Sequence, residues 1–124
     1  MLLNISNHPS AGWPAAQREA AVARFGAVAD LPHPSVDPAA GTADITALAR
    51  QTLQAVLDHP GQPHAVHVMG EQSFCYALIQ LLQAHGLPVF CSTTRRIAET
   101  LDNGDIRRGF TFVQFREYSL LRSA

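Results

Sequence analysis

A cluster of polar side chains at residues 92–96, Ser-Thr-Thr-Arg-Arg, ends the most hydrophobic stretch of the sequence. It combines three hydroxyl groups, from Ser92, Thr93 and Thr94, with two guanidinium groups, from Arg95 and Arg96. Hydroxyl and guanidinium groups bind phosphate oxygens through hydrogen bonds and charge. The cluster therefore predicts one wall of an anion site. The alternative interpretation is that the hydroxyl residues are caps or turn formers and that the arginines are solvated.

The segments that position this cluster alternate between short apolar runs and longer amphipathic ones. Strands are predicted at residues 1–6, 27–31, 64–69 and 87–91, and helices at residues 14–25, 42–59 and 72–85. Thr42 is the expected N-cap of the second helix. Strands that alternate with helices require crossover connections, which are right-handed and produce a mainly parallel sheet with helices on both faces. The predicted fold class is therefore α/β, with residues 1–124 in a single domain.

The last third of the chain departs from this alternation. Asn103 and Gly104 lie between two segments rich in β-branched and aromatic residues, which is typical of a β-hairpin. A short helix over residues 95–101 is the alternative, because Ile-Ala-Glu-Thr-Leu is compatible with a helix. We favour the C-terminal hairpin. The phenylalanine spacing changes parity between Phe112 and Phe115, which predicts a β-bulge or a strand buried on both faces.

Polar residues follow each of the predicted strands. In an open parallel sheet, ligands bind beyond the carboxyl ends of the strands, at the point where the strand order reverses. The residues expected on this rim are Asn7, His8 and Ser10, then His33 and Ser35, then Gly70, Glu71 and Ser73, and finally residues 92–95. Their hydroxyl, imidazole and guanidinium groups, together with exposed backbone N–H groups, suit a phosphate or a ribose.

Several of these residues also have a purely structural interpretation. His8 is compatible with a loop residue that bonds to backbone. A carboxylate at Glu71 is favoured by the dipole of the helix that follows, whatever the function. His67 lies inside an apolar strand, which is typical of a core histidine with satisfied hydrogen bonds. Trp13 is expected to pack against the first helix, although a ring beside the rim could stack on a base.

Charge and motifs exclude several classes of protein. The formal net charge is −1, which argues against a protein that binds duplex nucleic acid. Six of the nine basic residues follow residue 90, so a small anion would prefer that end of the chain. The motifs of P-loop NTPases, dinucleotide-binding proteins and GxSxG hydrolases are absent, and so are paired carboxylates at metal-binding spacing. We therefore expect metal-independent chemistry with no cofactor.

Cysteine usage and hydropathy indicate the compartment. Cys75 and Cys91 lack zinc-type spacing, which predicts two buried thiols in a reducing cytoplasm. The N-terminal residues lack the basic start and the long apolar run of a signal peptide. No stretch reaches the roughly 20 apolar residues of a membrane span. These observations predict a soluble, cytoplasmic protein with no membrane partner.

Four segments together resemble the small stand-alone CRISPR-associated proteins whose Rossmann-like fold is related to the CARF domain. They are LLNISNHPS (residues 2–10), HAVHVMGE (64–71), VFCSTTRR (89–96) and FTFVQFREY (110–118). Their order and spacing match through almost the whole chain, least closely over residues 30–60. Several members of this family bind or degrade cyclic oligoadenylate, an antiviral second messenger, and are called ring nucleases.

The resemblance implies a homodimer whose paired rims hold and open a ring of linked adenylates. A ribose 2′-hydroxyl attacks the adjacent phosphate and leaves a 2′,3′-cyclic phosphate, and loss of the ring switches off type III CRISPR signalling. The residues that match the phosphate-binding segment are Ser92, Thr93, Thr94 and Arg95, and those that match the first-strand loop are Asn7, His8 and Ser10. Gly70 and Glu71 are further ligand-binding candidates on the third strand's exit.

The candidate catalytic residues are His8, Arg95 and Arg96. His8 would act as general acid or base, and a guanidinium would stabilise the extra negative charge on phosphorus. Only one of the two arginines is expected in the site, because neighbouring residues of a strand point to opposite faces. Two other functions stay open: a protein that binds or sequesters the ring without cutting it, and a nucleoside-processing enzyme with Glu71 as nucleophile.

Overall fold

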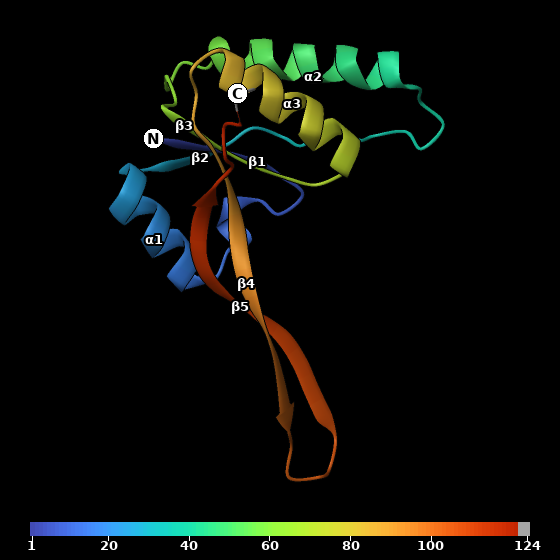
Figure 1. Ribbon diagram of the computed structural model, residues 1–124. Coiled ribbons are helices and arrows are strands. Elements are labelled where there is room, and N and C mark those ends of the chain that lie inside the picture. Colours follow the sequence, from blue (N-terminus) through green and yellow to red (C-terminus); the bar gives the residue numbers. More distant parts are fainter. Residues whose placement is uncertain (122–124) are drawn as a thin grey trace.

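A five-stranded sheet forms the centre of the protein in the computed structural model, which describes residues 1–121 (Figure 1). The strands are β1 (Leu2–Ser6), β2 (Val28–Asp30), β3 (Ala65–Met69), β4 (Val89–Thr100) and β5 (Ile106–Glu117). Their order across the sheet is β2-β1-β3-β4-β5, with β1 to β4 parallel and β5 antiparallel to β4. The predicted α/β class, mainly parallel sheet and C-terminal hairpin are therefore confirmed.

Three helices cover the two faces of this sheet. They are α1 (Ala15–Phe25), α2 (Thr42–Leu57) and α3 (Gln72–Ala84), and a short 3-10 turn, η1 (Ser10–Gly12), precedes α1. α1 lies on one face, whereas α2 and α3 pack side by side on the other (Figure 1). The chain leaves β1 toward β2 on the α1 face and returns over the α2 face to β3. The strand order therefore reverses between β1 and β3.

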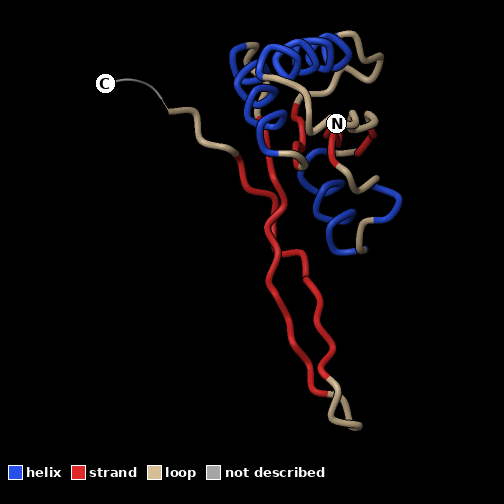
Figure 2. Tube along the Cα trace, turned by 90° about the vertical axis from the view of Figure 1, so that its right-hand side faces the viewer, coloured by secondary structure: helices blue, strands red, loops and turns tan. Residues whose placement is uncertain are grey.

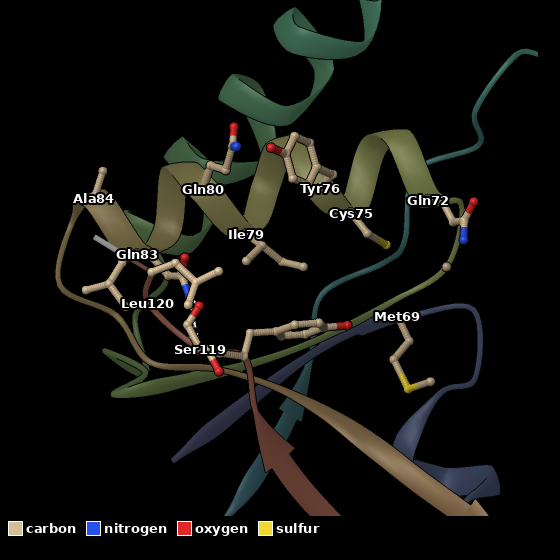
Figure 3. Close-up of a pocket in the computed structure, with 13 residues that line it drawn as sticks. Met69, Gln72, Cys75, Tyr76, Ile79, Gln80, Gln83, Ala84, Ser119 and Leu120 are labelled. Atoms are coloured by element: carbon tan, nitrogen blue, oxygen red, sulfur yellow. Dashed lines mark hydrogen bonds between the residues drawn. The ribbon is translucent and has the colours of Figure 1, made fainter. Parts of the chain in front are cut away.

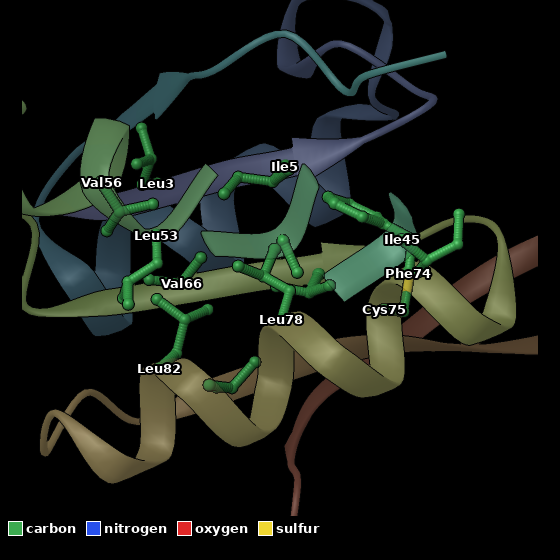
Figure 4. Close-up of a cluster of buried hydrophobic side chains, with 13 residues drawn as sticks. Leu3, Ile5, Ile45, Leu53, Val56, Val66, Phe74, Cys75, Leu78 and Leu82 are labelled. Carbon is green, nitrogen blue, oxygen red and sulfur yellow. The ribbon is translucent and has the colours of Figure 1, made fainter. Parts of the chain in front are cut away.

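The larger hydrophobic core lies between the sheet and the pair α2 and α3 (Figure 4). α3 buries Phe74, Leu78 and Leu82, which recur every four residues and form one apolar stripe. These side chains meet Leu3 and Val66 of the two central strands. The smaller core, on the α1 face, contains Leu2, Trp13, Ala21, Phe25, Ala65, Phe90 and Phe115. Because both faces are covered, β1 is buried along its whole length.

The N-terminus of α2 has a different capping residue from the one predicted. Gly41, and not Thr42, is the N-cap of α2. The carboxylate of Asp44 accepts a hydrogen bond from the backbone N–H of Gly41 at 3.0 Å, which satisfies this end of the helix without the threonine. Thr42 is already the first helical residue.

The fourth strand is much longer than the predicted residues 87–91, because β4 continues to Thr100 through its pairing with β5. The polar cluster at residues 92–96 therefore lies within a strand, and the alternative of a short helix there is wrong. Thr93 pairs with Gln114 and Thr94 pairs with Phe112, so Val113 is an extra residue. This register shift is the β-bulge that the phenylalanine spacing predicts.

The outer halves of β4 and β5 form a two-stranded arm that projects away from the helices (Figures 1 and 2). Its turn is closed by the N–H of Leu101, which donates to the carbonyl of Asp105 at 2.7 Å. Gly104 has a φ of 89°, a conformation that favours glycine in this turn. The Asn103-Gly104 signal therefore correctly located the tip of the hairpin.

Two remaining expectations concern cysteine and the membrane. Cys75 is buried as predicted, whereas Cys91 is only half-buried. Burial raises the pKa of the Cys75 thiol to about 11, with a further contribution from the charge of Glu71. Over residues 1–121, none of the helices combines the length and the apolar character that crossing a membrane requires.

Candidate functional site

A pocket of about 420 Å³ opens on the α1 face of the sheet, at the carboxyl ends of β1 and β3 and beside the first half of β4. We call it the rim pocket. Its polar lining comes from Ser6, His8, Gln17, His67, Ser92 and Thr94, and its apolar walls come from Gly12, Trp13, Pro14, Met69, Phe110 and Phe112. It lies beside the β1–β3 boundary, where the strand order reverses. This is the position at which open α/β sheets bind ligands.

Strand alternation explains why polar groups gather there. On the α1 face, β1 presents Leu2, Asn4 and Ser6, and β4 presents Phe90, Ser92 and Thr94. In each strand the apolar residue comes first and lies within the core, and the polar residues follow it along the strand. β3 repeats this pattern with Ala65 followed by His67. The same face therefore changes from core to site along the strands.

A continuous chain of hydrogen bonds runs across the sheet and reaches the rim pocket at His67 and Ser92. The amide nitrogen of Asn4 donates to Oδ1 of Asp30 at 2.8 Å and to the carbonyl of His8 at 3.0 Å. Oδ1 of Asn4 lies 2.8 Å from Nδ1 of His67, and Nε2 of His67 lies 2.8 Å from Oγ of Ser92. We call Asp30, Asn4, His67 and Ser92 the polar chain. The sheet register makes it possible, because Asn4 lies directly opposite both Asp30 and His67.

His67 supplies the imidazole of the polar chain, and only 2% of its surface is exposed. Trp13 and Phe115 pack edge-on against its ring, at centroid distances of 5.2 and 5.7 Å. Burial lowers the pKa of His67 to about 4, so the ring is neutral at physiological pH. The expectation of a satisfied core histidine is confirmed, since both ring nitrogens have partners. The ring nevertheless also forms part of the pocket wall.

Asp30 anchors the outer end of the polar chain. Its Oδ2 accepts from the Ser10 hydroxyl at 2.6 Å, and its Oδ1 accepts from the Ser10 N–H at 2.9 Å. Partial burial pushes the pKa of Asp30 upward, but the hydrogen bonds from Ser10 and Asn4 outweigh this effect and lower it. Asp30 is therefore a carboxylate at neutral pH.

The loop after β1 holds His8 at the pocket through its backbone. The carbonyl of His8 accepts hydrogen bonds from Asn4, from the Ser6 hydroxyl at 3.0 Å and from Nε1 of Trp13 at 2.9 Å. The imidazole itself is exposed and lines the rim pocket. A fixed backbone thus presents a solvent-accessible ring to the cavity.

The structure brings together three of the predicted site residues, His8, Ser92 and Thr94, in the rim pocket. Ser10 lies beside them as the partner of Asp30 and does not line the cavity. Thr93 points to the opposite face of β4, where its hydroxyl donates to the carbonyl of Gln114 at 3.2 Å.

The other candidates of the first and third strand ends lie outside the rim pocket. Asn7 lines a separate hollow of about 400 Å³ with Pro9 and His33. Glu71 is the N-cap of α3, where its carboxylate accepts from the N–H groups of Ser73 and Phe74. The Ser73 hydroxyl contributes most to lowering the pKa of Glu71, followed by these two N–H groups. The helix-capping interpretation of Glu71 is therefore confirmed.

Arg95 and Arg96 both lie exposed on the arm, and neither lines the rim pocket itself. Arg96 shares the face of Ser92 and Thr94, because residues two apart on a strand point the same way. It also lies directly opposite Phe110, which does line the pocket. Arg95 points to the other face, opposite Thr111. Arg96 is therefore the arginine at the mouth of the pocket.

A larger cavity, of about 1010 Å³, lies between α3 and the segment after β5 (Figure 3). Its labelled lining includes Tyr76, Ile79 and Leu120, and its walls are mainly apolar. It contains none of the hydroxyl or imidazole groups of the rim pocket. Gly70 lines this cavity and not the rim pocket. The candidate residues His8, Ser92 and Thr94 therefore gather in the rim pocket and not in this larger cavity.

Sequence reasoning missed Gln17, which lines the rim pocket, and the two members of the polar chain behind it, Asn4 and Asp30. The alternative in which the ring of Trp13 lies beside the rim agrees with its place in the pocket wall. The available signal was a single polar residue at the centre of an otherwise apolar strand, Leu-Leu-Asn-Ile. A buried polar side chain must have partners, so Asn4 pointed to further polar groups on neighbouring strands. Over residues 1–121, no group of three or more His, Cys, Asp or Glu side chains could hold a metal ion.

Comparison with known proteins identifies a family. The chain matches the model of the Uncharacterized protein MJ1673 family over residues 1–116, which include every strand residue except the last and the whole rim pocket. No curated protein and no solved structure matches the chain.

Proposed function

We propose that this chain, which belongs to the MJ1673 family, binds cyclic oligoadenylate in the rim pocket and opens the ring without a metal. In this proposal the sheet and its helices are a Rossmann-like domain related to the CARF domain. The observation that carries the proposal is the meeting of His8, Ser92 and Thr94 in one cavity with aromatic walls. Hydroxyl and imidazole groups suit a phosphodiester, and aromatic rings suit a base.

The reaction needs positioning and charge stabilisation more than chemistry from a cofactor. A ribose 2′-hydroxyl attacks the neighbouring phosphorus, the bond to the 5′-oxygen breaks, and a 2′,3′-cyclic phosphate remains. Thr94 and Arg96 lie on the face where they could contact the phosphate. Donors of this kind stabilise the extra negative charge that develops on phosphorus. In this proposal His8, which lines the pocket, gives a proton to the leaving 5′-oxygen.

The size of the rim pocket favours a homodimer. A volume of about 420 Å³ lies toward the low end of the range for small-molecule sites. One chain would therefore hold only part of a ring of three or more adenylates. A second copy, related by two-fold symmetry, would supply the matching half of the site. Such an activity would remove a second messenger and switch off type III CRISPR signalling in the cytoplasm.

The direct test incubates the purified protein in EDTA with labelled cyclic tri-, tetra- and hexa-adenylate. Linear products with 2′,3′-cyclic phosphate ends support the proposal. An intact ring that co-elutes with the protein reduces the function to binding, and a ring that neither binds nor opens overturns it. His8→Ala should lower the rate while the ring still binds, whereas His85→Ala is the matched control, since His85 is exposed at the far end of α3.

A further inference from the structure

The donor and the acceptor of each hydrogen bond in the polar chain can be assigned, starting from Asn4. The Asn4 amide nitrogen has two acceptors, Oδ1 of Asp30 and the carbonyl of His8. Both of its N–H groups are thereby used, and the amide oxygen must point at His67. An amide oxygen accepts hydrogen bonds and cannot donate them. Nδ1 of His67 therefore carries the proton of the neutral ring.

This tautomer decides what Ser92 does. With Nδ1 protonated, Nε2 of His67 is an acceptor, so the Ser92 hydroxyl donates its single proton across the 2.8 Å contact. Oγ of Ser92 also accepts a hydrogen bond from Nε2 of Gln17 at 3.0 Å. A hydroxyl oxygen has two lone pairs, and Gln17 occupies one of them. One acceptor position of Ser92 is left, and Ser92 lines the rim pocket.

We infer that Ser92 accepts the proton of a substrate hydroxyl while passing its own proton to Nε2 of His67. The inference rests on the proposed function, in which that hydroxyl is the attacking ribose 2′-OH. Asn4 and Asp30 are positioning residues, because they act only by holding the tautomer of His67. Because the Ser92 hydroxyl already donates its proton to His67, it can accept from a hydroxyl group but cannot donate to a phosphate oxygen. In the proposed function Thr94 has that second role.

Every proton that moves in this step has a donor and an acceptor, and no further reactant is needed. The 2′-OH proton moves to Oγ of Ser92 as the Ser92 proton moves to His67, and the O2′–P bond forms as the P–O5′ bond breaks. The leaving 5′-oxygen takes a proton from His8. Afterwards His67 returns its proton through Ser92 to water, and water restores His8. The linear product is an isomer of the ring, so no proton is consumed overall.

The surroundings of His67 favour the neutral ring in the free protein, so a transient imidazolium depends on the charge that the ligand brings. Its direct contacts are neutral: Asn4 on β1, Ser92 on β4, and the rings of Trp13 and Phe115. The nearest carboxylate of the polar chain is Asp30, one residue further through Asn4. The exposed ring of His8 lies in the same pocket. A bound phosphodiester would add a negative charge there and favour the imidazolium form.

The test measures ring binding and single-turnover opening separately, with the protein in excess over cyclic oligoadenylate. Ser92→Ala should slow opening by about 100-fold or more while the dissociation constant changes by less than about threefold. Ser92→Thr, which restores a hydroxyl, should recover most of the rate. His67→Gln should slow opening to a similar extent. Ser119→Ala is the control for loss of an exposed serine hydroxyl, and it should leave the rate unchanged.

A spectroscopic measurement checks the direction of the chain independently of activity. In ¹⁵N-resolved NMR spectra at neutral pH, His67 should show a protonated Nδ1 and a bare, hydrogen-bonded Nε2, and the Nε2 signal should shift in Ser92→Ala. A protonated Nε2, or Ser92→Ala protein that opens the ring at the wild-type rate, overturns only the proton transfer through Ser92 to His67, which we call the relay. Wild-type protein that neither binds nor opens any ring overturns the proposed function, and the relay with it.

Discussion

The imidazole of His33 lies against Gly70, so that Nε2 of His33 occupies the space that a Cβ at residue 70 would need. Nδ1 of His33 donates to the carbonyl of Pro34 at 2.8 Å, which fixes the ring in this place. Gly70 itself has a φ of 155°, in a region that side chains rarely adopt. The turn from β3 into α3 and the loop after β2 are therefore fitted to each other.

Gly70→Ala should consequently lower the free energy of unfolding by about 1–3 kcal/mol, through overpacking and backbone strain. Chemical denaturation measures this change. His33→Ala should restore part of the loss in the double variant, because it removes the colliding ring. Gly12→Ala is the matched control, since no atom lies within 4 Å of the added carbon there. Equal effects of the two glycine substitutions would contradict this packing.

The buried ring of His67 should make stability depend on pH. Its pKa falls from 6.5 in the unfolded chain to about 4 in the folded protein, because burial disfavours the charged form. Below pH 6.5 the unfolded state therefore binds the proton first, and the contribution of the neutral ring is lost as the pH falls toward 4. Above pH 6.5 the contribution is fully present. The total loss from this group is roughly 3 kcal/mol.

Urea denaturation between pH 4 and pH 7.5 measures this effect as a difference between variants. The slope of stability against pH should be shallower in His67→Gln than in the wild type over this window. His85→Gln, which replaces an exposed ring at the C-cap of α3, is the matched control. If His67→Gln has the same slope as the wild type, burial does not lower the pKa of His67 in the folded protein.

The success of sequence reasoning varied along the chain for physical reasons. α3 was located within one residue, because its apolar residues recur at one period and a glycine, Gly86, follows its end. β4 was cut short at Cys91, because the arm beyond it is exposed and shows no alternation of apolar and polar residues. Its strands are stabilised by pairing with each other, which a local pattern does not reveal.

In the candidate site, too, some residues could be predicted from the sequence and others depend on strand pairing. Topology placed His8, Ser92 and Thr94 together, since each follows or continues a strand at the carboxyl edge. Asn4 and Asp30 were missed, because their importance arises from register: Asn4 lies opposite Asp30 on one side and opposite His67 on the other. Such a row across three strands joins residues far apart in the sequence. Only the assembled sheet makes it visible.

Two phenylalanines of β5 should separate stability from ligand binding. Phe115 is 4% exposed and packs against the rings of Trp13 and Phe25, whereas Phe110 is 69% exposed at the rim pocket. Phe115→Ala should lower the free energy of unfolding by about 3–5 kcal/mol, and Phe110→Ala should change it by less than about 0.5 kcal/mol.

Thermal and chemical denaturation, followed by titration with cyclic oligoadenylate, would measure both effects. Phe110→Ala should weaken ring binding despite its unchanged stability, because an aromatic wall of the pocket is lost. If Phe115→Ala does not fold, Phe115→Leu is measured instead, and it should lose less stability. A large stability loss in Phe110→Ala would contradict the exposed position of the arm.

The two neighbouring arginines of β4 should differ in their effect on the ligand. Arg96 lies on the same face as Ser92 and Thr94 and opposite Phe110, whereas Arg95 lies on the reverse face. Hydrogen bonds to charged groups contribute about 1.5–3 kcal/mol. Arg96→Ala should therefore weaken binding of cyclic oligoadenylate by about tenfold or more, and the affinity of the variant should depend less on salt. Arg95→Ala removes the same charge one residue away and should change the dissociation constant by less than about twofold.

Isothermal titration at two salt concentrations measures both the dissociation constant and its dependence on salt. Equal losses in the two variants would mean that the arginines act only through net charge, and a larger loss for Arg95→Ala would place the ligand on the opposite face of the arm.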